Sequence, residues 1–244
     1  MQTVQDHPTP RDAALGTAQF AGAPQAGVGV GVGVGVSDAA RRVLRNTYGL
    51  LALTLLFSAG TAALSVAMKL PHPGILITLV GYFGLLFLVH KLQDSGWGIG
   101  AVFALTGFMG VTLGPLLTQS LALPGGAQTV MLALGATGAV FLALSGWVLT
   151  TRRDLSAMGG FLFAGMVIAL IGAVAAAFMQ VPALSLAVAA MVALLSAGLI
   201  MFETSRILHG GETNYVMATV SLYVSVFNLF TSLLSLFGFG SSSE

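Results

Sequence analysis

The chain has 244 residues, of which 56% are hydrophobic and only 7% are charged. Soluble domains carry about 25% charged residues, so lipid rather than water must cover most of this surface. A net charge of +1 argues against a nucleic-acid-binding surface, and the absence of cysteine excludes disulfides, zinc–cysteine sites and a thiol nucleophile.

The first 46 residues read as a tail rich in Gly, Ala, Pro and Gln, with scattered charges and no helical apolar stripe. Within it, Gly27 to Val36 alternates glycine with valine. Because glycine weakens strands and breaks helices, we interpret residues 1–46 as a flexible cytoplasmic linker, with self-association through the Gly-Val run as the alternative. The tail lacks the apolar core of a signal peptide, and most of its basic residues follow the Gly-Val run.

From Tyr48 onward, apolar segments of roughly 20 residues recur, the length that a helix needs to cross about 30 Å of hydrocarbon. Helices are expected because every backbone N–H must be satisfied inside lipid. The pattern predicts an all-α polytopic membrane protein, with a seven-helix domain at 47–240 and a short outside tail at 241–244. The seven spans are placed at 48–68, 74–90, 98–121, 127–150, 158–179, 183–203 and 214–238.

The distribution of Lys and Arg predicts the orientation of these spans. If the N-terminus is cytoplasmic, the tail and the loops at 91–97, 151–157 and 204–213 hold eight of the nine Lys and Arg residues, and the other side holds only Lys69. We therefore expect a cytoplasmic N-terminus and, after seven spans, a C-terminus on the opposite side.

Glycine marks close helix packing in the third span, where Gly107, Gly110 and Gly114 precede Pro115. Gly110 and Gly114 are four residues apart on one face, and small residues there let helix backbones approach closely. Pro115 is expected to kink the helix. Tight bundle packing is one interpretation, and a hinge that opens a path is the other.

The last span carries a stripe of polar or small residues along nearly its whole length. Because such a stripe would be costly against lipid, we expect it to face the bundle, where it forms interhelical hydrogen bonds or lines a wet cavity. The sixth span carries a weaker stripe of Ser185, Ala189, Ser196 and Glu203, and the two stripes are expected to meet. The stripe of the last span is Asn214, Ala218, Ser221, Ser225, Asn228, Ser232 and Ser235.

Ionisable residues cluster where the sixth and seventh spans adjoin. Residues 155–202 contain no Asp, Glu, Lys or Arg, and then Glu203, Arg206, His209 and Glu212 follow within ten positions. Glu203 and Arg206 are three residues apart, so they can pair on one helical face. We interpret them as a structural ion pair or as a gate or proton-sensitive latch, to which His209 could add pH sensitivity.

Motifs of catalytic and metal-binding sites are not found in the sequence. It lacks the His-Glu-x-x-His of membrane metalloproteases and a phosphate-binding glycine loop with Lys. His72 and His90 lie at other span ends without the spacing of a ligand set. We therefore predict no catalytic residues, no metal site, no cofactor and no enzymatic activity.

Six motifs lie in order across about residues 41–240: Arg45–Tyr48, Thr106–Pro115, Leu149–Asp154, Phe202–Ser205, His209–Tyr215 and Ala218–Ser225. Together they resemble the Bax inhibitor-1 family, and more closely its bacterial YccA-like branch, which modulates the FtsH membrane protease. The resemblance implies a bacterial inner-membrane protein with a periplasmic C-terminus. It also implies a seven-helix bundle whose last helix is central and ringed by the other six.

The resemblance implies two activities. The YccA-like branch implies binding to an FtsH-like ATP-dependent protease and to the membrane partner proteins of that protease. Residues 1–40 would then offer the protease an unstructured handle. We therefore predict a multi-pass protein, embedded in membrane lipid, that binds and modulates such a protease.

The alternative is a pH-sensitive calcium or proton leak channel. Some family members are similar to channels gated by an acid on the sixth helix paired with an acid on the seventh. Glu203 matches the first position, whereas Ser225 aligns with the second. One carboxylate and a hydroxyl bind a divalent cation poorly compared with two carboxylates, which makes ion transport doubtful. The gating or latch candidates are Glu203, Arg206, Ser225, Asn228, His209 and Glu212.

Overall fold

The computed structural model describes residues 37–241, so the predicted flexible tail at 1–36, with its Gly-Val run, and residues 242–244 lie outside the described residues. The described chain folds into seven long helices and one turn of 3-10 helix, and all seven are long and apolar enough to cross a membrane. The prediction of an all-α protein with seven spans is confirmed. The elements are α1 (Asp38–Ala67), α2 (Ile75–Leu92), α3 (Trp97–Leu121), α4 (Gly126–Thr151), η1 (Ser156–Met158), α5 (Gly159–Met179), α6 (Pro182–Leu208) and α7 (Tyr215–Ser241).

The first helix begins earlier than its hydropathy indicates. α1 starts at Asp38, so residues 38–46, assigned to the tail by sequence, are helical. The Ser37 side chain accepts a hydrogen bond from the Ala40 N–H at 3.1 Å, and Asp38 places negative charge in the first turn, where the helix dipole favours it. Hydropathy marks only the part of a helix that lies in hydrocarbon, whereas capping residues set its end.

The sixth and seventh helices also extend beyond the C-terminal ends of their predicted spans. α6 continues to Leu208 because Thr204, Ser205 and Leu208 are buried against the rest of the bundle rather than exposed in a loop. α7 includes Ser241, the first residue of the predicted C-terminal tail. Both helices therefore continue beyond the ends of the spans that hydropathy predicts.

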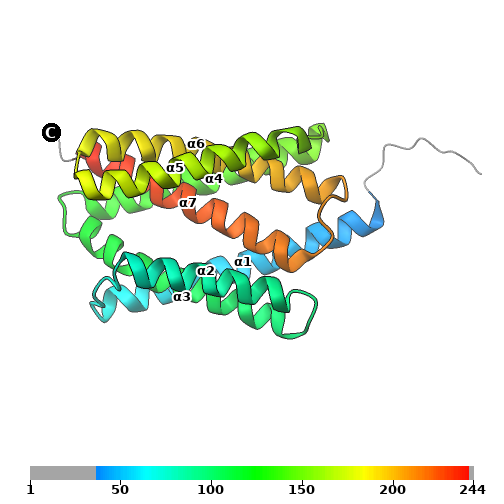
Figure 1. Cartoon of the computed structure of the whole chain (residues 1–244), viewed down its shortest axis with the longest axis horizontal. Helices are drawn as coiled ribbons and strands as arrows, with labels where there is room; N and C mark the ends of the chain where they lie inside the picture. Colours follow the sequence, from blue (N-terminus) through cyan, green and yellow to red (C-terminus); the bar gives the residue numbers. More distant parts are fainter. Residues whose placement is uncertain (1–36, 242–244) are drawn as a thin grey trace, which may run out of the picture. The chain divides into compact units, whose positions relative to one another are not determined.

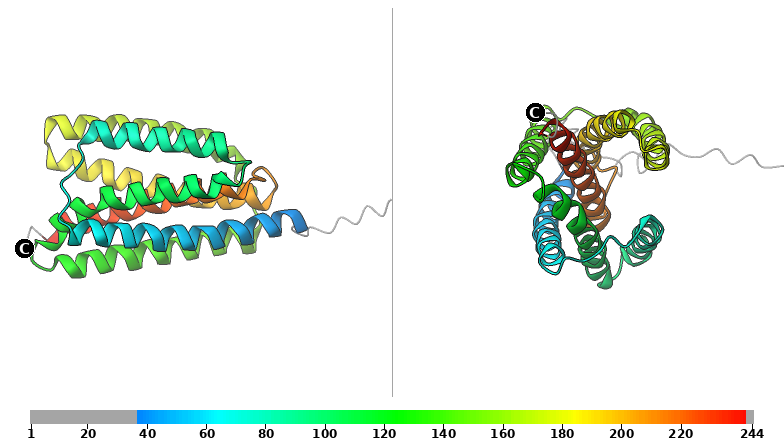
Figure 2. Two further views of the ribbon diagram at one scale, coloured as in Figure 1. Left: turned by 90° about the horizontal axis from the view of Figure 1, so that it is seen from below. Right: turned by 90° about the vertical axis from the view of Figure 1, so that its left-hand side faces the viewer.

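The last helix lies at the centre of the bundle, as predicted (Figures 1 and 2). α7 packs against α1, α2, α3, α4 and α6. In the described part of the chain it does not contact α5, which packs on the outer side of α6. Five helices, and not the expected six, therefore surround α7, because α6 separates it from α5.

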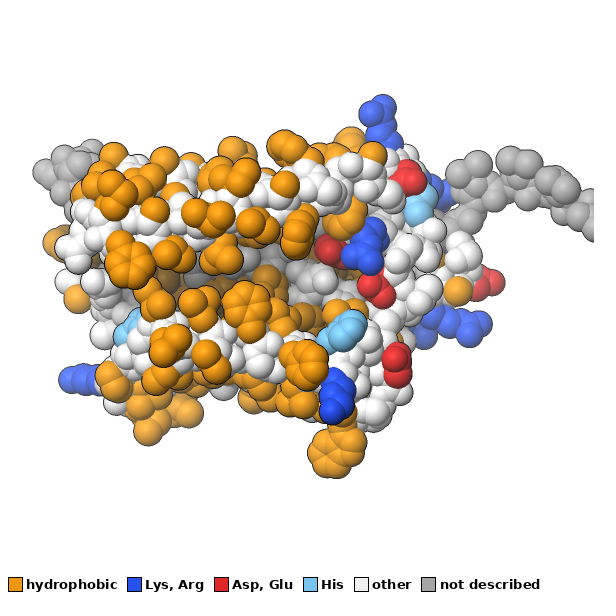
Figure 3. Space-filling model, viewed as in Figure 1, with side chains coloured by type: hydrophobic (Ala, Val, Ile, Leu, Met, Phe, Trp, Pro, Cys, Tyr) orange, Lys and Arg blue, Asp and Glu red, His pale blue; other side chains and the backbone are white. Residues whose placement is uncertain are grey.

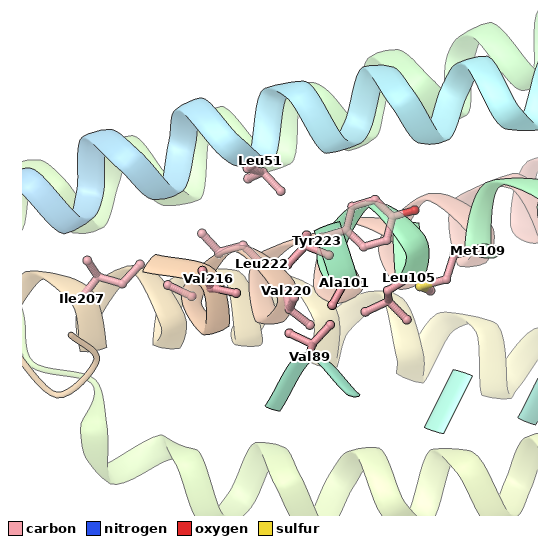
Figure 4. Close-up of a cluster of buried hydrophobic side chains, with 12 residues drawn as sticks. Leu51, Val89, Ala101, Leu105, Met109, Ile207, Val216, Val220, Leu222 and Tyr223 are labelled. Carbon is pink, nitrogen blue, oxygen red and sulfur yellow. The ribbon is translucent and has the colours of Figure 1, made fainter. Parts of the chain in front are cut away.

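The largest buried apolar cluster joins five helices around the first half of α7 (Figure 4). Leu51 of α1, Val89 of α2, Leu105 of α3 and Ile207 of α6 meet Leu222 and its neighbours on α7. Lipid tails are as apolar as these side chains, so burial from water contributes little to this contact inside a membrane. Close van der Waals packing and hydrogen bonds must hold the helices together instead.

α1 and α3 pack closely against each other. A Cβ atom at Gly110 would collide with the Thr61 hydroxyl and the Ser58 carbonyl, and one at Gly114 would collide with the Ser65 side chain. The absent side chains let the Ser65 hydroxyl donate to the Val111 carbonyl across the two helices at 2.9 Å. The glycine face of α3 therefore fits directly against α1. Pro115 follows within α3, which continues to Leu121.

Gly110→Ala should destabilise the protein by about 1–3 kcal/mol, because the new methyl group overlaps backbone and hydroxyl atoms of α1. Thermal unfolding in detergent micelles measures this loss. Gly100→Ala is the matched control, because Gly100 lies on the same helix and a Cβ atom there would meet nothing within 4 Å. Equal melting temperatures for the two variants would contradict this account of the α1–α3 contact.

Candidate functional site

The charged cluster predicted from sequence forms at the end of α6. The Arg206 guanidinium donates from Nη1 to Glu203 Oε2 and from Nη2 to Glu212 Oε2, each at 3.3 Å. One helical turn places Glu203 and Arg206 on the same face. Gly210 then adopts a φ of 75°, a left-handed conformation that glycine tolerates, and the chain turns back so that Glu212 reaches Arg206. One cation therefore lies between two carboxylates.

The two ends of this cluster differ in exposure. The Glu203 side chain is 9% exposed, whereas that of Arg206 is 31% exposed. The guanidinium carbon also lies 5.5 Å from the centre of the Phe202 ring, within the range of a cation–π contact. Phe202 in turn covers Gly159, at the start of α5. Glu203 is thus a buried carboxylate whose charge is balanced by a partly solvated arginine.

A second set of contacts fastens the α4–α5 loop to α6. The Ser205 hydroxyl donates to the Arg153 carbonyl at 3.1 Å and accepts from the Leu155 N–H at 2.9 Å. His209 places Nδ1 2.9 Å from the Ser205 carbonyl and Nε2 3.2 Å from the Arg152 carbonyl. The His209 side chain therefore connects the end of α6 to the α4–α5 loop. In the described residues it is not hydrogen-bonded to Glu203 or Glu212.

The same loop contains an acidic residue with a shifted pKa. The Ser156 hydroxyl and the Ser156 N–H both donate to Asp154 Oδ1, and these two hydrogen bonds lower the pKa of the Asp154 carboxyl. Asp154 is thereby bonded to the first residue of the 3-10 turn η1. The carboxylate thus orders the loop that Ser205 holds.

Thr204 joins three helices beside the charged cluster. Its hydroxyl donates to the Ile200 carbonyl at 2.7 Å, so it accepts from Tyr48 of α1 at 3.3 Å and lies 3.5 Å from the Ser145 hydroxyl of α4. Sequence reasoning did not assign a role to Tyr48, Thr204 or Ser205. Tyr48, Thr204 and Ser205 all lie in the motifs Arg45–Tyr48 and Phe202–Ser205 that carry the family resemblance. Those motifs were the sequence feature that could have pointed to them.

Asn214 ties the α6–α7 turn to the α2–α3 turn. Its side-chain oxygen accepts from the Val216 N–H at 2.9 Å and caps α7, while its amide donates to Asp94 Oδ1 at 3.0 Å. Glu212 Oε1 accepts from the Asn214 N–H at 2.9 Å. Glu212 therefore connects the Arg206 cluster to the start of the central helix.

The polar stripe of α7 lies at the edge of its contact with α6. Ser225 and Ser232 are buried, whereas Ser221, Asn228 and Ser235 are half-buried. In the described residues no side-chain hydrogen bond joins α6 to α7. The Ser225 hydroxyl donates to the Ser221 carbonyl of its own helix at 2.9 Å.

The interhelical hydrogen bonds expected between the two polar stripes are therefore not found among the described residues. The buried contact between the helices includes an apolar cluster of Ala193 and Ile200 of α6 with Val226 and Leu229 of α7. Ser196 is buried on the same side of α6, and its hydroxyl has no hydrogen-bond partner among the described residues. Hydroxyls on α7 are satisfied by their own backbone, so the helices need no polar contact to pack.

Half-buried residues follow one face of α7, between α6 on one side and α2 and α3 on the other. Neither α2 nor α3 contacts α5 or α6 in the part of the chain that the structure describes. Figure 3 shows the resulting hollow, with acidic and basic side chains at one end. A cavity of about 610 Å³ near this face is lined by His72, Thr112, Pro115, Gln119 and Thr231, among others. The face comprises Met217, Ser221, Val224, Asn228, Thr231 and Ser235.

The structure brings together only some of the predicted site residues. Glu203, Arg206 and Glu212 form one cluster, and His209 lies beside it in the loop contacts. No hydrogen bond or ion pair links Glu203 to Ser225 or to Asn228 among the described residues. Over the same residues no group of three or more His, Asp or Glu side chains could hold a metal ion.

The family model for inhibitors of apoptosis-promoting Bax1 matches residues 40–242. This chain belongs to the Bax inhibitor-1 family. The chain is 54% identical over 203 residues to "Modulator of FtsH protease YccA" of Escherichia coli K12, a match that covers 83% of this chain and 92% of that relative. An uncharacterized protein of Pseudomonas aeruginosa is 50% identical over 83% of this chain and 91% of its own length.

A third relative agrees with the membrane assignment. An uncharacterized membrane protein of Vibrio cholerae is 41% identical over 83% of this chain and 92% of its own length. A protein of another strain, Escherichia coli O6:H1, is also 54% identical to this chain and is named "Inner membrane protein YccA". The resemblance to the YccA-like branch is confirmed, and the chain is a multi-pass membrane protein with seven spans.

Arg206→Gln should destabilise the protein by about 1–3 kcal/mol, because it leaves the buried Glu203 carboxylate without its cation. The partial exposure of Arg206 keeps the cost below that of a fully buried pair. Thermal unfolding in detergent measures the loss. The double variant Glu203→Gln/Arg206→Gln should recover much of it, since the more buried carboxylate is then gone and only Glu212, whose side chain is 18% exposed, has lost its cation. A double variant as unstable as the single one would contradict the charge-balancing role of Arg206.

Proposed function

We propose that this protein binds and restrains an FtsH-type ATP-dependent protease in the bacterial inner membrane. The observation that carries the proposal is the 54% identity over 92% of a relative named as a modulator of that protease. Family membership and seven membrane-spanning helices support it, because a partner of a membrane protease must share its bilayer.

We propose that the end of the bundle carrying Glu203 is cytoplasmic. Of the described Lys and Arg residues, only Lys69 belongs to a connection at the opposite end, and positive residues favour the cytoplasmic side. Seven spans then put the C-terminus in the periplasm. The residues at the proposed cytoplasmic end are Arg41, Arg42, Arg45, Lys91, Arg152, Arg153 and Arg206.

The structure suggests how such a protein could restrain a protease that pulls on its substrates. The first turns of α1 lie at the Glu203 end of the bundle, where Tyr48 of α1 contacts Thr204, and residues 1–36 precede them in sequence. A protease that grips this segment must next extract α1. That helix fits against the glycine face of α3 and also contacts α7, so extraction must break close helix packing. A bound protease would therefore be occupied for long periods.

Deletion of residues 2–36 tests the proposal while sparing Ser37 and the first turn of α1. Co-purification with the FtsH-type protease from native membranes should fall several-fold, and degradation of the protein itself should slow, because the protease loses its point of attachment. A variant with the same 35 residues in scrambled order is the control for composition and length. Unchanged co-purification and unchanged turnover after deletion would refute a role for the tail.

The alternative function is a calcium or proton leak, and the half-buried polar face of α7 beside the Glu203 cluster is the observation that favours it. In liposomes, calcium and proton fluxes should then exceed those of empty vesicles and should change with pH. Glu203→Gln should alter that pH dependence, because it removes the one buried carboxylate near this face in the described part of the chain. Fluxes identical with and without the protein would reject the leak and leave protease binding unaffected.

A further inference from the structure

We propose that the cleft between α1 and α4 binds one hydrocarbon chain of a membrane lipid. α1 and α4 do not contact each other in the described residues, while α3 and α7 close the space behind them. The cleft has a volume of about 620 Å³. It is lined by the second half of α1, the end of α3, the first half of α4 and the middle of α7. It therefore lies in the half of the bundle away from the Glu203 cluster.

The lining offers no hydrogen bond to a ligand. Only Ser58, Thr137 and Tyr223 bring hydroxyl groups to the cleft. The Ser58 and Tyr223 hydroxyls bond to each other at 2.6 Å, and the Tyr223 hydroxyl donates onward to the Thr106 carbonyl at 3.3 Å. The Thr137 hydroxyl donates to the Ala133 carbonyl at 2.7 Å. A polar group placed here would lose its hydrogen bonds to water without replacement, so the ligand must be apolar at this depth.

Small side chains create the space. Alanines at 59, 62, 63 and 67 form the α1 wall, and Gly138 lies on the α4 wall. A Cβ atom at Gly138 would meet nothing within 4 Å, which shows that the space extends to the α4 backbone. Phe227 and Phe230 of α7 form the floor. The cleft is therefore deep, apolar and open toward the side of the bundle that faces lipid.

The position of the cleft decides between a lipid chain and a helix as the occupant. Its lining residues Ala59, Ala63 and Leu134 are exposed on helices that can cross a membrane, so the acyl chains of the bilayer reach it directly. A helix with its side chains is about 10 Å across and would have to seat that whole width between α1 and α4. An extended hydrocarbon chain is one methylene wide, and carbon atoms pack at about 3.5–4.0 Å, so it can enter between α1 and α4. Leaving such a space empty forfeits dispersion contacts along its walls. A lipid chain from the leaflet at this end of the bundle is the occupant that fits.

Photo-crosslinking with a chain-labelled lipid tests this site. The full-length protein is reconstituted in vesicles of phosphatidylethanolamine and phosphatidylglycerol that contain a phosphatidylethanolamine with a diazirine in the middle of one acyl chain. Crosslinked residues are mapped by mass spectrometry. The cleft residues Ala59, Ala63 and Leu134 should be labelled more strongly than Phe161 and Phe178, which are exposed on α5 and report contact with bulk lipid.

Gly138→Leu should reduce labelling of the cleft roughly fivefold or more, because its side chain projects into the space that the lipid chain would fill. Gly135→Leu is the matched control, since Gly135 lies on the same helix, also has open space around it and does not line the cleft. If Gly138→Leu unfolds the protein, Ala63→Leu from the opposite wall should reproduce the loss. Equal labelling of cleft and α5, or equal loss in the Gly135 control, would overturn the proposal, as would crosslinks between copies through Ala63.

Discussion

Polar groups in this protein must find their partners inside the protein, because hydrocarbon offers them none. The seam between α1 and α3 shows the consequence most directly. Gly110 and Gly114 have no room for a side chain, and this closeness lets Ser65 reach the Val111 carbonyl on the facing helix. Burial from water cannot hold these helices together in a membrane, so contact distance matters most. α7 packs against both α1 and α3, so its position depends on the contact between these two helices.

Three consecutive residues at the end of α6 organise the opposite part of the molecule. Thr204 contacts α1 and α4, Ser205 holds the α4–α5 loop, and Arg206 draws in the α6–α7 turn through Glu212. Consecutive residues on a helix point about 100° apart, so each can serve a different neighbour. At the end of the bundle that carries most of the charge, hydrogen bonds and an ion pair therefore connect α6 to several neighbouring elements. Under the proposed function, these contacts would oppose extraction at the end of the bundle from which the protease pulls.

The central helix separates two different environments. One face of α7, with Ser221, Asn228 and Thr231, is half-buried, and Thr231 also lines a cavity of about 610 Å³. Another face, with Tyr223, Phe227 and Phe230, closes an apolar cleft whose hydroxyl groups are already satisfied. The hydroxyls of Ser225 and Ser235 bond to their own helix, which allows polar residues to sit beside an apolar interface at little cost. The two faces therefore suit ligands of different chemistry.

Composition and residue spacing were enough to predict the class of protein, the seven spans and the pairing of Glu203 with Arg206, while the family was indicated by the resemblance of six sequence motifs. The first three follow from charge content, from segment length against hydrocarbon thickness and from residues a few positions apart. The start of α1, the end of α6, the brace at Ser205, the return of Glu212 to Arg206 and the apolar contact between α6 and α7 required the tertiary structure. Each of them depends on which residues distant in sequence come within hydrogen-bonding or van der Waals distance. Hydropathy does not record that information, because it averages over neighbours along the chain and not across the bundle.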